Sequence, residues 1–281
     1  HYTRGATGWL LLMGTLSVAI AVVEVSLYAG VGRLVDALIA SDRATFFAEN
    51  SGLLALLAAL VLVVMPALSL TWSLVTHQAL LGNYPMRIRW SVHRYLLRQS
   101  MRYFQDEFAG RIATKLMQTS LAVRETVVKL LDVGSYVLVY IGGAMLIAAT
   151  ADWRLLLPFL VWVGCYALLM RWFLPRMQQV STAQADARST MTGRIVDSYT
   201  NIATVKLFSH SLREQRYARE AMDGFLGTVH SQMRLVTVVN VVNDALNMLL
   251  LASVATLGLW LWSDGAASPG DVAVALALVL R

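Results

Sequence analysis

The stretch MRYFQDEFAGRIA, residues Met101–Ala113, decides the fold, because one long helical pattern runs toward it and another runs away from it. The first is apolar and then amphipathic and extends from Gly52 to about Tyr103, and the second extends from Arg111 to about Ala151. At 1.5 Å per residue the first helix would be roughly 75 Å long, whereas the hydrocarbon core of a bilayer is about 30 Å thick. We therefore expect both helices to project well beyond a membrane and this stretch to form the turn at their tip.

The composition is that of a polytopic membrane protein. Hydrophobic residues make up 57% of the chain and charged residues only 14%, and the mean hydropathy is +0.59. Soluble domains normally carry about a quarter charged residues. We predict an all-α fold with six transmembrane helices at about residues 7–40, 52–84, 132–151, 153–174, 234–262 and 270–281. The sixth is too short to span, so we expect it to be incomplete and to continue past Arg281.

The distribution of basic residues predicts the orientation. Of the 23 Lys and Arg, nine lie between Arg87 and Lys129 and nine between Arg171 and Arg234. Cytoplasmic loops of membrane proteins are enriched in Lys and Arg. We expect residues 85–131 and 175–233 to be cytoplasmic loops, the N-terminus to be cytoplasmic, and the protein to lie in the plasma membrane, as in a bacterial inner membrane. The net charge of +6 therefore reflects insertion in a lipid bilayer, and we do not expect the protein to bind nucleic acid.

Polar residues form faces on three of the predicted spans. In the first span Glu24 shares a face with Ser17 and Tyr28, and in the second Ser73 and His77 follow Pro66, which should distort the helix. Such groups face a bundle interior or a water-filled cavity. For Glu24 a substrate pathway and a hydrogen bond between helices remain equally open. His77 has no partner at metal-ligand spacing, and no metal site is predicted.

The fifth span carries the widest polar stripe. Asn240, Asn243, Asp244 and Asn247 recur at i, i+3, i+4 and i+7, so they cover about 100° of one helix face. Hydrogen bonds between helices are the simpler explanation. We favour a substrate pathway or a central dimer face, because packing seldom needs so many polar positions. The predicted pathway residues are Glu24, Tyr28, Ser73, His77, Asn240, Asn243, Asp244 and Asn247.

Both predicted loops are amphipathic helical hairpins. In the first, an apolar side formed by Ile88, Val92, Tyr95, Leu96 and Gln99 is matched by Ile112, Leu116, Val123, Val127 and Leu130. The second has its midpoint near residue 202, in the run SYTNIATVKLFSH, residues 198–210. Two hairpins of similar reach predict a docking platform. Since the sequence contains no G-x-x-x-x-G-K-[ST], C-x-x-C, H-E-x-x-H or G-x-S-x-G motif, we expect no catalysis by this segment and an energy source on another domain.

Three segments resemble a known family, the transmembrane domains of six-helix ABC exporters with the type IV transporter fold. They are RYLLRQSMRYFQDEFAGRIATKLMQTSLAVRE at 94–125, NIATVKLFSHSLREQRYARE at 201–220 and SPGDVAVALAL at 268–278. The resemblance covers essentially the whole chain. The sequence departs from the family pattern at Asn83 and Pro85, where most relatives continue a straight helix, and at His210, near a position where an acid is common.

The resemblance implies that the two tips are coupling helices seated on an ABC ATPase domain, which lies either after residue 281 or on a partner chain. ATP and Mg²⁺ would bind to that nucleotide-binding domain, and the full-length protein would be an ATP-hydrolysing translocase. A second transmembrane half, identical or different, would complete a transporter that alternates between inward-open and outward-open states. The residues that match the coupling segments are Tyr103, Phe104, Asp106, Gly110, Ile202, Val205, Lys206 and Phe208.

We therefore expect the membrane-spanning half of an ATP-driven exporter for an amphipathic organic substrate, such as a drug, lipid, peptide or thiol conjugate. An alternative is an ion-coupled secondary transporter or channel in which Glu24 and Asp244 are the ion sites. A membrane anchor without transport is a third hypothesis. The second is disfavoured because such proteins seldom place two long helical hairpins in the cytoplasm, and the third leaves the polar faces unexplained.

Overall fold

The structure is a computed structural model that describes residues 5–106, 109–207 and 211–280. Every regular element within these ranges is helical, and no strand occurs in them. Five helical segments are long and apolar enough to cross a membrane, namely Thr7–Ala40, Ser51–Leu96, Ile112–Ala151, Trp153–Thr200 and Leu212–Ser263. The predicted sixth span is present as the shorter apolar helix α11, Pro269–Leu280. The predicted all-α membrane fold is confirmed.

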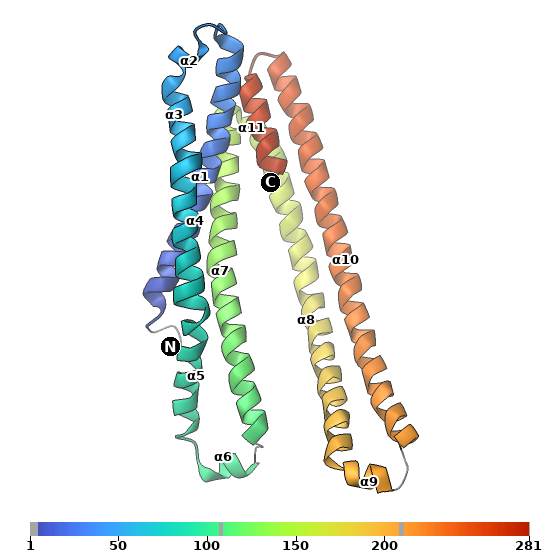
Figure 1. The fold of residues 1–281 in the computed structure, drawn as a ribbon. Helices are drawn as coiled ribbons and strands as arrows, with labels where there is room; N and C mark the ends of the chain where they lie inside the picture. The colour runs from blue at the N-terminus through green and yellow to red at the C-terminus, as the bar shows by residue number, and fades with distance from the viewer. Residues whose placement is uncertain (1–4, 107–108, 208–210, 281) are drawn as a thin grey trace. The chain divides into compact units, whose positions relative to one another are not determined.

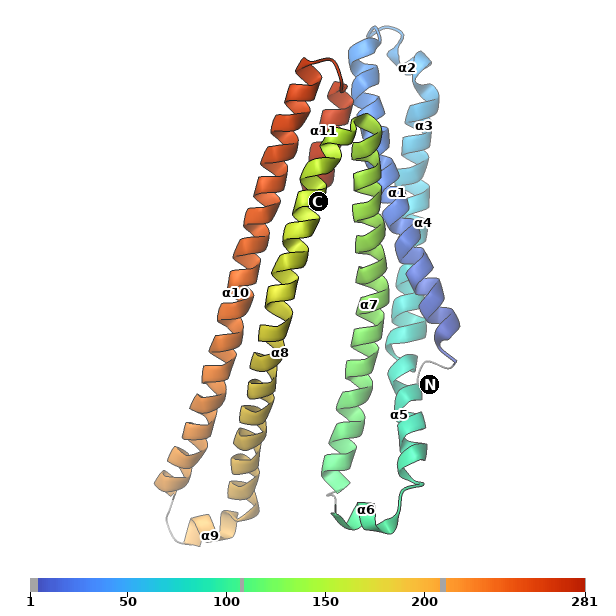
Figure 2. The same cartoon turned by 180° about the vertical axis from the view of Figure 1, so that it is seen from behind.

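The helices fall into two units, which we describe one at a time. The first comprises the chain up to Leu156 and from Ala255 onward, and the second comprises Leu157–Val254. In the first unit, α1 (Thr7–Ala40) packs along both α7 (Ala109–Ala151) and α11 and also contacts α4 (Met65–Ser73) (Figures 1 and 2). The short helix α2 (Phe46–Glu49) follows α1, and the 3-10 turn η3 (Trp153–Leu155) follows α7.

Glycine allows the backbones of α1 and α11 to meet. A Cβ atom at Gly270 would lie 2.2 Å from the carbonyl oxygen of Gly32, and one at Gly32 would lie 2.3 Å from Cγ2 of Val274. The carboxylate of Asp36, one turn after Gly32, accepts hydrogen bonds from the Gly270 amide and the Ser268 hydroxyl, each at 2.7 Å. A side chain from α1 therefore caps the start of α11 and satisfies one of its free amide groups.

The second membrane-spanning segment is one long helix with two π-helical turns. It comprises α3 (Ser51–Ala59), the π turn η1 (Leu60–Val64), α4, the π turn η2 (Leu74–Leu81) and α5 (Asn83–Leu96). Pro66 has no amide hydrogen, so an α-helix could not form its usual bond there. The amide of Met65 instead donates to the carbonyl of Leu60, five residues earlier. The distortion expected at Pro66 is thus a π turn that precedes it.

The second departure from a regular helix lies before Pro85. The π turn η2 ends at Leu81, and the side-chain amide of Asn83 donates to the carbonyl of Gln78 at 3.2 Å. This bond satisfies a carbonyl that the α-helical pattern would have paired with a backbone amide. Asn83, one of the residues that differ from the family pattern, therefore accommodates the change of helix geometry, while His210 lies outside the described residues.

The main apolar core of the first unit lies where the start of α1 meets η2 and α5. Its buried side chains include Leu10, Met13, Leu80, Tyr84 and Ile88. Beyond this core α5 and α7 run side by side to the short helix α6 (Met101–Asp106) (Figure 1). This position of α6 confirms the predicted turn for the described part of Met101–Ala113; residues 107–108 lie outside it.

The predicted packing of this hairpin is largely confirmed. Ile88, Val92 and Leu96 of α5 line one small cavity together with Ile112, Leu116 and Val123 of α7. Tyr95 and Leu130 are exposed instead, and their assignment to the packed face is wrong. Tyr95 lies in the last turn of α5, and Leu130 lies ten residues beyond Ser120, whose hydroxyl accepts a hydrogen bond from Arg89 of α5 at 3.0 Å. The packing of α7 continues past Ser120 through Val127, Val128 and Leu131, so Leu130 is exposed because it lies off the packed face, as Tyr95 does beside Leu96.

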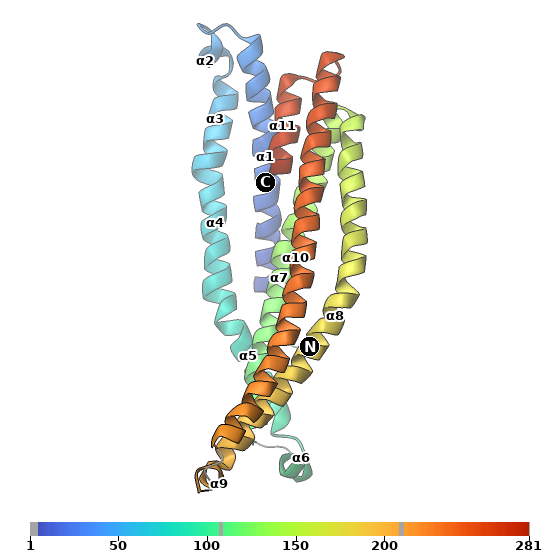
Figure 3. The same ribbon diagram turned by 90° about the vertical axis from the view of Figure 1, so that its right-hand side faces the viewer.

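The second unit is a helical hairpin of two long helices. It comprises nearly all of α8 (Leu156–Thr200) and α10 (Ser211–Ser263) up to Val254, with the short helix α9 (Ile202–Leu207) between them (Figure 3). Their antiparallel register is set by long side chains, as in the 2.8 Å hydrogen bond from Gln184 to Gln232. Pro175 lies inside α8 and does not end it. Only a few side chains in this unit are buried, so most of both helix surfaces remain open.

Candidate coupling and substrate-pathway sites

The tip of the first unit presents an aromatic pair. The rings of Tyr103 and Phe104 on α6 meet edge to face, with centroids 5.3 Å apart and planes at 84°. Tyr103 is half-buried and lines the cavity of about 210 Å³ between α5 and α7, whereas Phe104 is 39% exposed. Tyr103 therefore anchors α6 to the hairpin, and Phe104 is exposed to solvent.

Asp106 and Gly110 lie at the adjoining ends of α6 and α7, and residues 107–108 between these helices are outside the described ranges. Asp106 is the last residue of α6, and Gly110 is the second residue of α7. A Cβ atom at Gly110 would meet no described atom within 4 Å. Packing within the described chain therefore does not account for this glycine, and its role in coupling stays a prediction.

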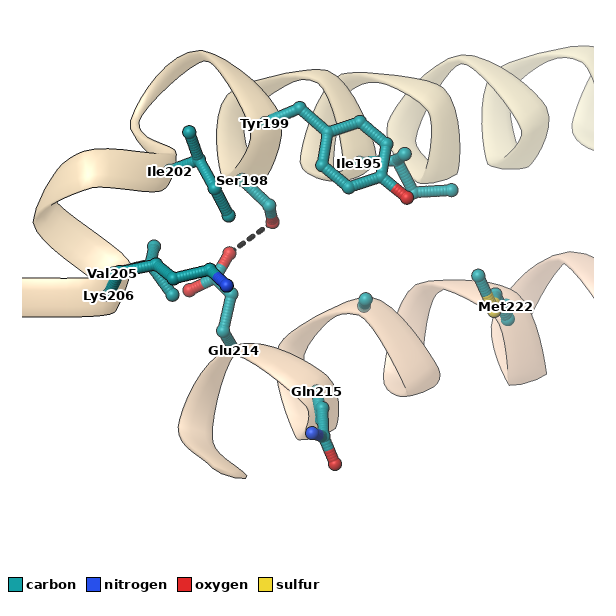
Figure 4. Close-up of a pocket in the computed structure, with 10 residues that line it drawn as sticks. Ile195, Ser198, Tyr199, Ile202, Val205, Lys206, Glu214, Gln215 and Met222 are labelled. Atoms are coloured by element: carbon teal, nitrogen blue, oxygen red, sulfur yellow. Dashed lines mark hydrogen bonds between the residues drawn. The ribbon is translucent and has the colours of Figure 1, made fainter. Parts of the chain in front are cut away.

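The tip of the second unit contains a cavity of about 480 Å³ between α8, α9 and α10 (Figure 4). Of the predicted coupling residues, Ile202, Val205 and Lys206 line it, while Phe208 lies outside the described residues. The neighbouring Leu207 is 80% exposed. This tip thus combines an apolar hollow with an apolar side chain directed to solvent.

The cavity is held in shape by polar contacts that the sequence analysis did not single out. The hydroxyl of Ser198 on α8 donates to the carboxylate of Glu214 on α10 across the cavity (Figure 4). Farther from the tip, the Arg194 guanidinium donates to the carbonyl of Tyr217 at 2.9 Å and lies 4.1 Å from its ring centre. Glu214 lies within the segment 201–220 that resembles the family, but its contact with Ser198 could be found only in three dimensions.

Glu24 lies at the interface of α1 and α7. It is 9% exposed, and its Oε2 accepts a hydrogen bond from the hydroxyl of Tyr136. The ring of Tyr136 stacks on that of Tyr140, whose hydroxyl donates to the carbonyl of Leu278 in α11 at 3.1 Å. The geometry is that of a hydrogen bond between helices, one of the two alternatives open for Glu24. Tyr28, one turn farther along α1, is half-buried, and its pathway role stays a prediction.

A second polar group in the first unit was missed. The Ser17 hydroxyl donates to Oδ1 of Asp132 at 2.6 Å, and the indole nitrogen of Trp72 donates to both, at 3.1 Å to Ser17 and 3.2 Å to Asp132. This group joins α1, α4 and α7. Asp132 is the first residue of the predicted third span, so a search for uncharged runs treats it as a boundary. An acid at the edge of an apolar run was the available signal.

Ser73 and His77 lie one turn apart in the second spanning segment. The Nδ1 atom of His77 is 3.2 Å from the Ser73 hydroxyl and 2.9 Å from its carbonyl oxygen. Ser73 is half-buried, and His77 is exposed. Among the residues that the structure describes, no three His, Cys, Asp or Glu side chains gather as a metal ion would require. The structure shows only contacts within one helix for this pair.

The stripe on the fifth span contacts α8 through Asn247. Asn247 is half-buried and accepts a hydrogen bond at 3.0 Å from the indole nitrogen of Trp162. Asn243 is half-buried, while Asn240 and Asp244 are exposed. The stripe therefore combines one residue engaged in packing with polar groups that are still accessible.

Comparison with known proteins agrees with the helical membrane fold described above. The family described as ABC transporter transmembrane region matches residues 10–281. A Haemophilus influenzae protein named "Uncharacterized ABC transporter ATP-binding protein" is 45% identical over 281 residues, which cover 99% of this chain and 45% of that protein. The chain thus spans less than half the length of this curated relative.

Among solved structures, a bacterial Atm1-family ABC exporter with ATP bound superposes with a TM-score of 0.78. The match covers 99% of this chain and 48% of that chain, at 17% sequence identity, and so shows a common fold. The family match extends over nearly the whole sequence, and the fold is that of an exporter. The chain therefore belongs to the family of ABC transporter transmembrane regions.

Proposed function

We propose that the chain is the membrane-spanning half of an ATP-driven exporter that moves an amphipathic organic substrate out of the cytoplasm by alternating access. The observation that carries this proposal is the exposed apolar surface at the two hairpin tips. The ion-coupled alternative is not favoured, because the family and the fold are those of ABC exporters.

The tips need a protein partner and not lipid. The helix α8 has 45 residues and is roughly 68 Å long at 1.5 Å per residue, more than twice the thickness of about 30 Å for a bilayer core. Its tip therefore stands in water, where exposed apolar side chains such as Ile202 and Leu207 mark an interaction site. An ATPase domain that binds ATP and Mg²⁺ would cover them. The name and the greater length of the curated relative support an ATPase on the same chain.

A second transmembrane half would cover the part of the second unit that lies between its tip and the membrane. Met222 and Leu226 lie on α10 between the tip and the predicted membrane segment, and both are exposed. Because lipid does not reach them, we infer that a second, identical or related half packs against this hairpin. The clusters of Lys and Arg support a cytoplasmic position of the tips and of the N-terminus in a bacterial inner membrane.

The substrate path is assigned to the stripe on α10. Its test uses the full-length transporter in nanodiscs, with Cys165 replaced by serine so that each variant carries one thiol in this chain. The Asn243→Cys thiol should react with a membrane-impermeant maleimide in one nucleotide state and be protected in another. Leu249→Cys is the matched control, because Leu249 is 66% exposed but lies about 160° around the axis of α10 from Asn247, on the opposite face of the helix. A thiol at this position should face lipid and stay unreactive in every state. Equal inertness of both thiols in all states would contradict the proposal.

A further inference from the structure

An aromatic pair and the polar stripe form one cluster in the second unit. The ring of Trp162 stacks on that of Tyr166, with centroids 5.3 Å apart and planes at 12°, while its indole nitrogen is held by Asn247. Tyr166 lies one turn after Trp162 on α8, and Asn243 lies one turn before Asn247 on α10. Because the two helices are antiparallel, Tyr166 and Asn243 lie at the same level. Tyr166 and Asn243 are therefore the next residues of this face along the two helices from the contact of Trp162 with Asn247.

Asp244 adds the charge. It is the only charged residue in the stretches 157–170 and 235–254, which form the apolar parts of the two helices in this unit. At 100° per residue its Cβ lies about 60° around α10 from that of Asn247, the residue that contacts Trp162. A carboxylate in an apolar membrane segment costs on the order of 3 kcal/mol when it faces hydrocarbon. Since Asp244 is exposed, it is suited to face water or a ligand.

The chemistry of the cluster selects positive charge together with a flat apolar body. The faces of tyrosine and tryptophan rings carry negative electrostatic potential and attract organic cations. The carboxylate of Asp244 adds a full negative charge, and the amide of Asn243 supplies hydrogen bonds. The nearest arginine along α8 is Arg171, about 140° around the helix from Tyr166, so it does not share this face.

We propose that Trp162, Tyr166, Asn243 and Asp244 form a binding site for an amphipathic organic cation. The inference rests on the proposed function, because it names the class of substrate for the path along α10. Trp162 is positioned by Asn247, which fixes the plane of the aromatic pair. Tyr166, which is 38% exposed, provides the accessible ring, and Asp244 provides the charge that separates cations from neutral and anionic compounds.

Two probes of the same shape and opposite charge test the site, namely tetraphenylphosphonium and tetraphenylborate. Binding of each radiolabelled ion to the full-length transporter in nanodiscs is measured, with binding to empty nanodiscs subtracted. The cation should bind saturably, and Asp244→Asn should weaken its affinity by about tenfold or more, the range of a lost charge-assisted contact. Affinity for the borate should not fall. Tyr166→Leu should weaken binding of the cation more than of the anion.

Controls separate charge from structure. Asp244→Glu keeps the charge and should retain most cation binding, and Asp264→Asn removes a carboxylate from the turn after α10 and should change nothing. Unchanged cation binding in Asp244→Asn, equal loss of both probes, or no cation binding by the wild-type protein would overturn the assignment to cations. The labelling of Asn243→Cys is independent of these probes. It can therefore support the path along α10 while the cation assignment fails, or contradict both.

Discussion

Replacing Gly270 with alanine should loosen the junction of α1 and α11. The new Cβ would lie 2.2 Å from the Gly32 carbonyl oxygen, whereas ordinary contacts between carbon and oxygen are about 3.3 Å, so the backbones must separate by about 1 Å. The same movement stretches the 2.7 Å hydrogen bond from the Gly270 amide to Asp36. Overpacking costs about 1–3 kcal/mol and a hydrogen bond to a charged group contributes about 1.5–3 kcal/mol. A total of about 3 kcal/mol is expected.

The assay is thermal unfolding of the purified transporter, followed by intrinsic fluorescence. At about 2–4 °C per kcal/mol for domains of 150–250 residues, Gly270→Ala should lower Tm by about 6 °C or more. Gly142→Ala is the matched control, because a Cβ there would meet no described atom within 4 Å. Alanine also favours a helix over glycine by about 0.5–1 kcal/mol, so this variant should be neutral or slightly stabilised. Equal Tm values for the two variants would refute the close approach of α1 and α11.

Three further variants test other contacts. Phe104→Ala should leave membrane insertion and Tm unchanged but abolish the stimulation of ATP hydrolysis by substrate, since the side chain is exposed at the tip; undiminished stimulation would count against coupling through α6. Asp132→Ala removes the acceptor shared by Ser17 and Trp72 and should lower the free energy of unfolding by about 1–3 kcal/mol, measured by the same thermal assay. Ser198→Ala should raise the accessibility of the second tip to protease, and cleavage at the wild-type rate would show that its bond to Glu214 does not hold the tip closed.

The features that the sequence predicted correctly are those with a short-range periodic signal. The recurrence of Ile88 and Val92 every four residues, and of Ile112 and Leu116 likewise, suffices to pair α5 with α7. The excess helix length beyond a bilayer suffices to place a turn between them. Both inferences depend on residues close together in the chain, where helix geometry fixes which side chains share a face.

The features that the sequence did not predict depend on pairs that are distant in the chain. Trp162 and Asn247 are separated by 85 residues, and nothing in either helix pattern specifies that they meet. Glu24 shows why a polar residue in an apolar span does not by itself reveal its role. A glutamate that is buried against Tyr136 and a glutamate that lines a pathway would produce the same sequence pattern. The approach of Gly32 to Gly270 likewise follows from the packing of two helices and not from either one.

The π turn Leu60–Val64 affects how this chain should be aligned with its relatives. A π turn holds one more residue than the α-helical turn it replaces, so the extra residue rotates everything that follows by about 100° relative to an uninterrupted helix. A relative without the turn would match this chain on both sides only if one residue were left unpaired between Leu60 and Val64. A chimaera in which the second span is exchanged between family members should therefore transfer the extra residue and Pro66 together, or neither of them. Otherwise the faces that carry Trp72 and Ser73 would be presented to the wrong neighbours.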